Sequence, residues 1–147
     1  MNKVVYTAKT EDWIRIKRFA KDTGVHLPEP NGKIQFLLMA DKPGELAAII
    51  GIDTTYREAV LRSLVIDGHK CKSDDVFYFL NTALAYASEQ KASAVYFATP
   101  AGSSLFTPLG FEEVEFSRLP EYLKQDWEKT YTNYPQEVVF LMKKLCT

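Results

Sequence analysis

The hydrophobic and polar positions along the chain alternate between two spacings, one typical of strands and one typical of helices. Runs of β-favouring or continuously apolar residues, bounded by turn residues, predict strands. These runs occupy residues 3–7, 33–39, 45–52, 58–66, 94–98, 111–116 and 138–142. The Asp-Lys-Pro-Gly segment at residues 41–44 joins the second and third runs. It predicts a hairpin, because proline and glycine favour a tight reversal.

Helical spacing predicts helices between these strands. Over residues 10–22, a Thr-Glu-Asp start caps the helix and Gly24 ends it. Its predicted buried face consists of Trp13, Ile14, Ile16, Phe19 and Ala20. Over residues 73–90, the apolar positions at helical spacing are Val76, Leu80, Ala83, Leu84 and Ala87. A short helix is expected over residues 101–106, stopped by the proline and glycine that follow.

The order of these elements predicts an α/β (α+β) fold in one domain over residues 1–147. In this fold a mixed, mostly antiparallel, twisted sheet of about seven strands is flanked by helices. The helix at residues 73–90 makes at least one parallel crossover, because it connects two predicted strands. A chain of this length is expected to bury a core of its own.

Composition and charge narrow the choice of partners. The chain has 18 basic and 19 acidic side chains, and its net charge of −1 disfavours binding to nucleic acid or anionic lipid. The longest apolar run, residues 46–52, is far shorter than the ~20 residues that cross a bilayer. The first residues lack the apolar core of a signal peptide, and two cysteines are too few for a disulfide framework. We therefore expect a cytoplasmic protein that contacts neither nucleic acid nor membrane.

Two segments carry a resemblance to a known family. The segment FATPAGSSLFTPLGFEEV, residues 97–114, has the order short helix, aromatic residue, Leu-Gly-Phe turn and strand. The segment LRSLVID, residues 61–67, forms a strand before a loop and a helix. With the element order, these segments resemble the GNAT superfamily of acetyl-CoA-dependent acyltransferases. The finer resemblance is to acetyltransferases encoded with arsenic-resistance genes, which act on amino-acid-like compounds. Its points of match are Leu61-Arg62-Ser63-Leu64, Thr99, Phe106 before Leu109-Gly110-Phe111, Arg118 with Pro120, and Pro135.

The resemblance implies a GNAT-like sheet, acetyl-CoA as co-substrate, and a small amine or amino-acid-like molecule as acceptor. The cofactor would lie along the central strand, the loop that follows it and the start of the next helix. The residues that the resemblance places there are Leu64, Val65, Ile66, His69, Lys70, Cys71, Lys72, Ser73, Thr99 and Phe106. His69 and Cys71 have no further ligand at metal-binding spacing, so no metal is expected.

The loop at residues 67–73 departs from the family's phosphate-binding pattern, Arg/Gln-x-x-Gly-x-Gly/Ala. Cys71 stands at the arginine position, and no glycine stands where small residues would let backbone amides approach phosphate. Asp74 and Asp75 favour the dipole of the following helix and repel a pyrophosphate. Two interpretations stay open. The side chains of His69, Lys70 and Lys72 hold phosphate by their charges, or they form a solvated turn before a capped helix.

Acetyl transfer to an amine needs a base, a donor to the thioester oxygen and an acid for the leaving thiolate. In the resemblance, the oxygen donor is a backbone N–H near Val65 or Ile66. The acid is usually a tyrosine at the position of Phe106, which has no proton to give, so solvent or the ammonium product would serve. Asp53 and Glu58, at the ends of two predicted strands, are the candidate bases, each reaching the amine through one water.

Arg62 lies within an otherwise apolar strand, so it is expected to face a cleft or to pair with a carboxylate. As a site residue, it binds the carboxylate of an amino-acid-like substrate, with Arg118 as a second clamp. As a structural residue, it pairs with Asp53 or Glu58 on the polar face of the sheet. Both interpretations stay open.

Two hypotheses of function follow from these features. The first is an acetyl-CoA-dependent N-acetyltransferase that acts on a small amine or amino-acid-like molecule. The second, favoured by the missing glycines and by Phe106, is a GNAT-fold module with impaired catalysis that binds a small ligand or a protein partner. The uncovered edges of an open sheet also predict a homodimer.

Overall fold

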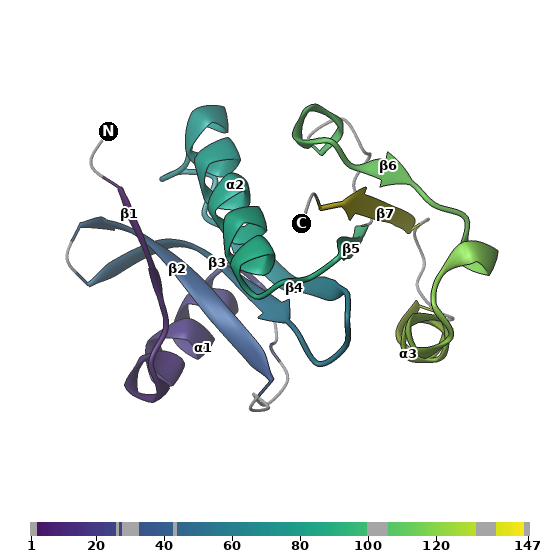
Figure 1. Ribbon diagram of the computed structural model, residues 1–147. Coiled ribbons are helices and arrows are strands. Elements are labelled where there is room, and N and C mark those ends of the chain that lie inside the picture. Colours follow the sequence, from purple (N-terminus) through teal and green to yellow (C-terminus); the bar gives the residue numbers. More distant parts are fainter. Residues whose placement is uncertain are drawn as a thin grey trace.

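One sheet runs through the chain. The computed structural model describes residues 3–25, 27, 33–42, 44–99, 106–131 and 138–145. Within these residues seven strands pair in the order β1-β2-β3-β4-β5-β7-β6 (Figure 1). Each pair of neighbours is antiparallel except β4 and β5, which confirms the predicted mostly antiparallel sheet. The strands are β1 (Val4–Thr7), β2 (Ile34–Lys42), β3 (Glu45–Asp53), β4 (Ala59–Ile66), β5 (Ala94–Thr99), β6 (Glu112–Glu113) and β7 (Val139–Lys144).

The helices connect and cover these strands. They are α1 (Trp13–Asp22), α2 (Ser73–Glu89) and α3 (Glu121–Tyr131), with short 3-10 turns η1 (Thr10–Asp12), η3 (Thr107–Leu109) and η4 (Phe116–Arg118). The predicted crossover is confirmed, because α2 leads from β4 to β5 and these two strands are parallel. The predicted hairpin is also confirmed, since β2 pairs with β3 down to Lys42 opposite Glu45.

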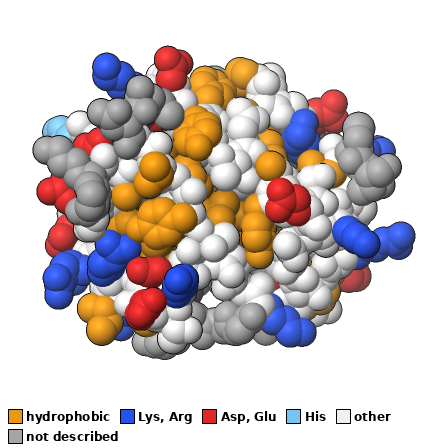
Figure 2. Space-filling model, turned by 60° about the vertical axis from the view of Figure 1, so that its left-hand side comes forward, with side chains coloured by type: hydrophobic (Ala, Val, Ile, Leu, Met, Phe, Trp, Pro, Cys, Tyr) orange, Lys and Arg blue, Asp and Glu red, His pale blue; other side chains and the backbone are white. Residues whose placement is uncertain are grey.

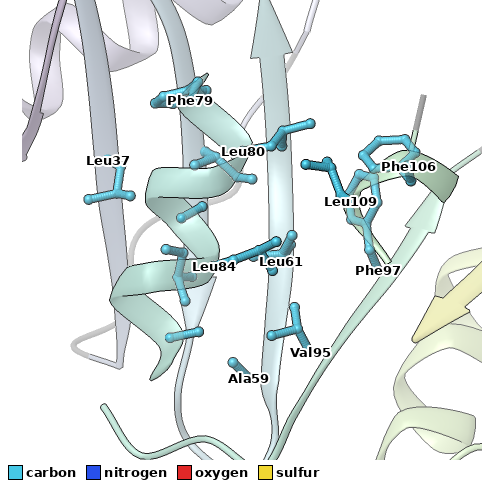
Figure 3. Packing of buried hydrophobic residues seen from close by; sticks show 14 of the residues in the cluster. Leu37, Ala59, Leu61, Phe79, Leu80, Leu84, Val95, Phe97, Phe106 and Leu109 are labelled. Carbon is cyan, nitrogen blue, oxygen red and sulfur yellow. The ribbon is translucent and has the colours of Figure 1, made fainter. Parts of the chain in front are cut away.

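One face of the sheet packs against α2. Phe79, Leu80 and Leu84 of this helix lie over Leu37, Leu61 and Val95 of the strands, as Figure 3 shows. The same cluster continues to Phe97 of β5 and on to Phe106 and Leu109. Burying a leucine or phenylalanine side chain contributes roughly 1.5–3 kcal/mol, so this cluster is the main source of stability in the fold.

The opposite face is covered by α1 at one end and α3 at the other (Figure 1). Ile16 and Ala20 of α1 are fully buried, as the helical spacing predicts. The prediction for Ile14 is wrong, because its side chain is 70% exposed. The apolar residues of α1 cover a wider arc than the face that contacts the sheet. Ile14 lies outside that contact face, on the solvent side.

The tail of the chain differs from the prediction in three places. The strand predicted at residues 111–116 is only β6, Glu112–Glu113, and the chain then turns into η4. Most of the helix predicted at 101–106 lies outside the described residues. Helix α3 was not predicted at all. Its buried stripe is narrow, with Leu123 and Trp127 one turn apart among polar residues, and the ring of Trp127 stacks on Phe140 at 5.4 Å.

Apolar side chains also reach the surface near the edge of the sheet. Figure 2 shows hydrophobic side chains gathered in a band on the side of the molecule where β1 lies. Val4 of β1 is 58% exposed, and Tyr78 on α2 is 43% exposed. A shallow groove of about 170 Å³ separates the two elements. Strand β1 is an edge of the sheet, so this side carries both unpaired backbone and exposed apolar area.

Candidate active site

Strands β4 and β5 separate soon after they begin. They pair only at Ala59 with Val95 and at Val60 with Tyr96, and the rest of β4 continues without β5 beside it. A bulge then interrupts the pairing of β4 with β3, because Ile49 faces Val65 whereas Gly51 faces Arg62. Ser63 lies in this bulge with a positive φ of 56°. A bulge interrupts the regular ladder, so the backbone N–H groups of Ser63 and Leu64 are the candidate donors on β4.

Gly51 allows β3 to approach this bulge closely. A Cβ atom at Gly51 would lie 3.0 Å from the Ile34 side chain and 3.2 Å from the carbonyl oxygen of Arg62. Such contacts are too short for an unstrained side chain, so the position favours glycine. Neither the bulge nor the role of this glycine was predicted, because neither has a local signal in the sequence.

A pocket of about 680 Å³ lies beside the bulge, on the face of the sheet that α3 covers. The end of β3, the residues that follow it, the middle of β4 and one side of α3 form its walls. Its lining residues are Lys33, Asp53, Thr55, Tyr56, Arg62, Tyr122 and Asp126. The structure therefore brings two predicted site residues, Asp53 and Arg62, into one pocket. Glu58 lies next to it, as the partner of Tyr122.

Arg62 connects three elements of the pocket. Its Nε donates to Asp53 Oδ2 at 3.0 Å, and its Nη1 donates to Asp126 Oδ2 at 3.0 Å. The pair with Asp53 is the more buried, since the Asp53 side chain is 8% exposed and that of Asp126 is 45% exposed. The ion pair of Arg62 with Asp53, which the structural interpretation expects, is therefore formed. The second partner, Asp126, was missed because α3 was missed.

Asp53 is held as a carboxylate. Its Oδ1 accepts hydrogen bonds from the amide of Thr55 at 2.9 Å and from the Thr55 hydroxyl at 2.5 Å. Burial raises the pKa of Asp53, but the bonds from Thr55 and Arg62 outweigh burial and hold that pKa below its ordinary value. Asp53 is therefore charged near neutral pH and is a weak base.

Glu58 accepts a hydrogen bond from the Tyr122 hydroxyl at 2.5 Å. Burial, and then the bond to Glu58, raise the pKa of Tyr122 far above its ordinary value, so the phenol keeps its proton. Burial and the charge of Glu58 likewise raise the pKa of Tyr96. The ring of Tyr122 stacks on Tyr56 with 3.8 Å between centroids, which gives the pocket an aromatic wall.

The loop after β4 uses its own backbone amides. The amide of His69 donates to Asp67 Oδ1, and the amides of Lys70 and Cys71 donate to the carbonyl oxygen of Asp67. The amide of Lys72 donates to Asp75 Oδ2 at 2.9 Å. Four consecutive amides are therefore occupied within the chain. The Nζ of Lys70 lies 3.4 Å from the carbonyl oxygen of Leu46, while His69 and Lys72 are exposed.

Asp75 is a buried structural residue rather than a free anion. Its carboxylate also lies 3.2 Å from the Nζ of Lys3, which precedes β1. The hydrogen bond from Lys72, followed by the bond and charge of Lys3, outweighs desolvation and lowers the pKa of Asp75. The repulsion predicted for a pyrophosphate is thus offset at Asp75 and remains at the exposed Asp74.

The other predicted site residues lie in different surroundings. Phe106 is 3% exposed and packs on Phe97 and Phe111, and Thr99 is buried at the end of β5. Leu64 and Ile66 face the α2 core, whereas Val65 faces the α1 cluster. Ser73 begins α2, and burial raises the pKa of the Cys71 thiol. Arg118 is exposed on η4 and is not among the residues that line the pocket with Arg62.

Two absences concern only the described part of the chain. Over these residues no helix combines the length and the apolar character that a membrane crossing needs. Nor do His, Cys, Asp and Glu side chains come together there in a group of three or more suited to a metal ion.

No family model matches the sequence, and no curated protein matches it. Solved structures match its fold. The N-acetylglutamate synthase of Neisseria gonorrhoeae, complexed with coenzyme A and N-acetyl-glutamate, is similar over 99% of this chain, with a TM-score of 0.77 and 14% identity. The chain spans 35% of the length of that enzyme.

Shorter proteins match over nearly their whole length. The ribosomal-protein-S18-alanine N-acetyltransferase of Escherichia coli gives a TM-score of 0.75 at 11% identity, over 99% of this chain and 95% of its own. A GNAT-family acetyltransferase of Staphylococcus aureus gives 0.72 at 13% identity, over 98% and 99%. Identities this low establish architecture and leave activity open. The chain therefore has the fold of the GNAT acetyltransferases.

Proposed function

We propose that this protein is an acetyl-CoA-dependent N-acetyltransferase that acts on a small amine. The observation that carries the proposal is the opening between β4 and β5, with a bulge on β4 and a carboxylate-lined pocket beside it. A backbone donor, a carboxylate and space for an acceptor then lie on adjoining parts of two strands. These are the groups that acetyl transfer to an amine requires.

Acetyl-CoA would supply the acetyl thioester, so that a C–N bond forms, the C–S bond breaks, the amine loses a proton and the thiolate gains one. Asp53 is the proposed acceptor of the amine proton, through one water. Its low basicity suits a carboxylate that keeps the water oriented and stabilises the positive charge on nitrogen as the C–N bond forms. Glu58 is the alternative base, although Tyr122 already occupies one of its oxygens.

The bulge at Ser63 supports a proposed oxyanion donor slightly earlier in β4 than the resemblance implies. The proposed donors are the backbone N–H groups of Ser63 or Leu64 instead of those near Val65 and Ile66, which lie opposite Ile49 and Ala48 of β3. Phe106 packs in the core and has no proton to donate. Solvent or the ammonium product is therefore proposed to protonate the thiolate.

The phosphates of the cofactor would be held by side chains rather than by the loop amides, which are hydrogen-bonded within the chain. The side chains of His69, Lys70 and Lys72 flank the start of α2, whose first-turn amides have no partner within the helix. The residues present thus fit an anion at this place by charge. Because none of these side chains is buried, binding should weaken strongly as salt concentration rises.

The occupied amides also favour a second candidate function. In this alternative the chain is a GNAT-fold module with impaired catalysis, and its pocket binds a small ligand or a protein partner. We also propose a homodimer, because apolar area is exposed along edge strand β1 and α2. Light scattering on the purified protein would measure the mass of the assembly.

Turnover separates the two candidates. The protein is incubated with acetyl-CoA and a panel of primary amines, while free thiol release and the mass of each amine are followed. The enzyme proposal predicts thiol release in equal amount to an amine gaining one acetyl group. Cofactor hydrolysis without an acetylated amine, or no thiol release with any amine, favours the module.

A further inference from the structure

The charges in the pocket point to one class of acceptor, and this inference rests on the proposed N-acetyltransferase function. We propose that the acceptor is a primary amine that has no carboxylate next to its amino group and carries an aromatic or other flat apolar body. The proposal comes from the two partners of Arg62, from the acidic groups around the pocket and from its aromatic wall.

Arg62 is already shared between two carboxylates. Its Nε and Nη1 donate to Asp53 and Asp126, both at 3.0 Å, and its side chain is only 27% exposed. A substrate carboxylate that bound the other N–H groups of this guanidinium would be the third carboxylate around one positive charge. Because the two partners already balance that positive charge, a third carboxylate meets their like charges and gains little free energy there. An amino acid therefore finds no strong anchor for its carboxylate at Arg62.

The remaining charges favour a cation. The lining residues include two cations, Lys33 and Arg62, and two carboxylates, Asp53 and Asp126. Glu58 lies directly behind Tyr122 and adds a third negative charge. An ammonium group entering this set brings the local charge to balance, whereas an additional carboxylate increases the negative excess. Like charges brought together in a half-buried pocket oppose binding.

The aromatic wall favours a flat apolar body. Tyr56 and Tyr122 are stacked at 3.8 Å with an interplanar angle of 19°, and Tyr56 remains 48% exposed at the pocket. The bond from Tyr122 to Glu58 holds one of the two rings in place. A ring or alkyl group gains dispersion and apolar burial on such a surface, and an ammonium gains a cation–π contact.

Phenethylamine and phenylalanine test this proposal, because they differ only by the carboxylate. Calorimetric titration of the wild-type protein at neutral pH should give a dissociation constant for phenethylamine at least about tenfold lower than for phenylalanine. Equal or tighter binding of phenylalanine overturns the proposal. So does an absence of binding by both at millimolar concentration.

Asp126→Asn supplies the second measurement. It removes one partner of Arg62 and one negative charge, so the preference for phenethylamine over phenylalanine should fall by about fivefold or more. Glu121→Gln is the matched control, because it changes the same charge on α3 at a side chain that is 78% exposed and outside the pocket lining. A preference that is unchanged in Asp126→Asn, or that falls equally in the control, contradicts the assigned role of Arg62 and Asp126.

Failure of the acceptor class and failure of the enzymatic function give different results. Tight binding of phenethylamine without acetylation supports the acceptor class and contradicts the N-acetyltransferase function. Acetylation of phenylalanine in preference to phenethylamine does the reverse. It supports the N-acetyltransferase function and overturns the acceptor class.

Discussion

At the scale of single residues, the central group of the pocket is the carboxylate of Asp53, which is buried and accepts hydrogen bonds on both oxygens. Asp53 accepts from Thr55 on one oxygen and from Arg62 on the other. A buried carboxylate with these partners is stable as an anion but gives up basicity. Its proposed value in catalysis is therefore its fixed position beside the bulge of β4, and this can be measured separately from its effect on stability.

Asp53→Asn should reduce turnover by about a hundredfold, which is the lower end for loss of a general base. The amide can still accept from Thr55, so folding is expected to survive with a loss of about 1–3 kcal/mol. Steady-state kinetics over a range of pH and urea unfolding measure the two effects. A pH–rate profile identical to that of wild type would reject Asp53 as the base.

Thr55→Val should move the acidic limb of the same pH–rate profile to higher pH. The hydroxyl of Thr55 stabilises the charged form of Asp53, so its removal raises the pKa of that carboxyl. The amide of Thr55 still donates, and the shift should therefore be partial. If the acidic limb stays in place or moves to lower pH, it reports the titration of a group other than Asp53.

Gly51→Ala should destabilise the protein by about 1–3 kcal/mol, the range for forcing an atom into a packed region. The new Cβ would meet the Ile34 side chain and the backbone of Arg62 at the bulge. Gly68→Ala is the control, since a Cβ there meets no atom within 4 Å. Thermal unfolding compares the two variants, and an equal effect would show that Gly51 is not needed for the approach of β3 to β4.

At the scale of elements, polar ties between distant segments hold α2 and α3 on the sheet. Lys3 joins the start of β1 to Asp75 in the first turn of α2, and Arg62 joins β4 to Asp126 on α3, 64 residues away. These ties explain why the start of α2 is ordered without a glycine-rich loop. They also separate the charge of Asp75, which is buried and paired, from the charge of Lys72, which is exposed.

Asp75→Asn should lower stability at neutral pH and make it less sensitive to acid. The pKa of Asp75 is lowered on folding, so its charge stabilises the protein above the unfolded pKa, and this contribution is lost as pH falls through the folded value. Urea unfolding at several pH values should show the variant and wild type converging in acid. Asp74→Asn is the control, because Asp74 is exposed, and convergence in both would contradict a specific role for Asp75.

Lys70→Glu with Lys72→Glu should weaken acetyl-CoA binding by about tenfold or more, because two cations at the proposed phosphate site become anions. Lys9→Glu with Lys91→Glu is the control. It makes the same charge change on two exposed side chains, which lie just after the C-terminal ends of β1 and α2. Calorimetry compares the two double variants. Equal affinities of the two double variants for acetyl-CoA would contradict the proposal that the side chains of Lys70 and Lys72 bind its phosphates.

At the scale of the whole molecule, the sequence predicted the architecture better than the site. Strand runs and the α2 stripe are local patterns, so the sheet, its hairpin and its crossover followed from spacing. The bulge at Ser63 and the close approach at Gly51 depend on pairing between strands, which leaves no local pattern. Among the described side chains of helix α3, the fully buried ones are Leu123 and Trp127, a narrow stripe, so Asp126 and Tyr122 were not predicted as pocket residues.

Binding of acetyl-CoA tests the central claim most directly. The wild-type protein is titrated with acetyl-CoA in a calorimeter at low and at high salt, with the thermal unfolding midpoint measured alongside. The account predicts a dissociation constant on the order of micromolar at low salt, weaker binding at high salt and a raised unfolding midpoint. No heat and no change in unfolding midpoint at millimolar acetyl-CoA would contradict it.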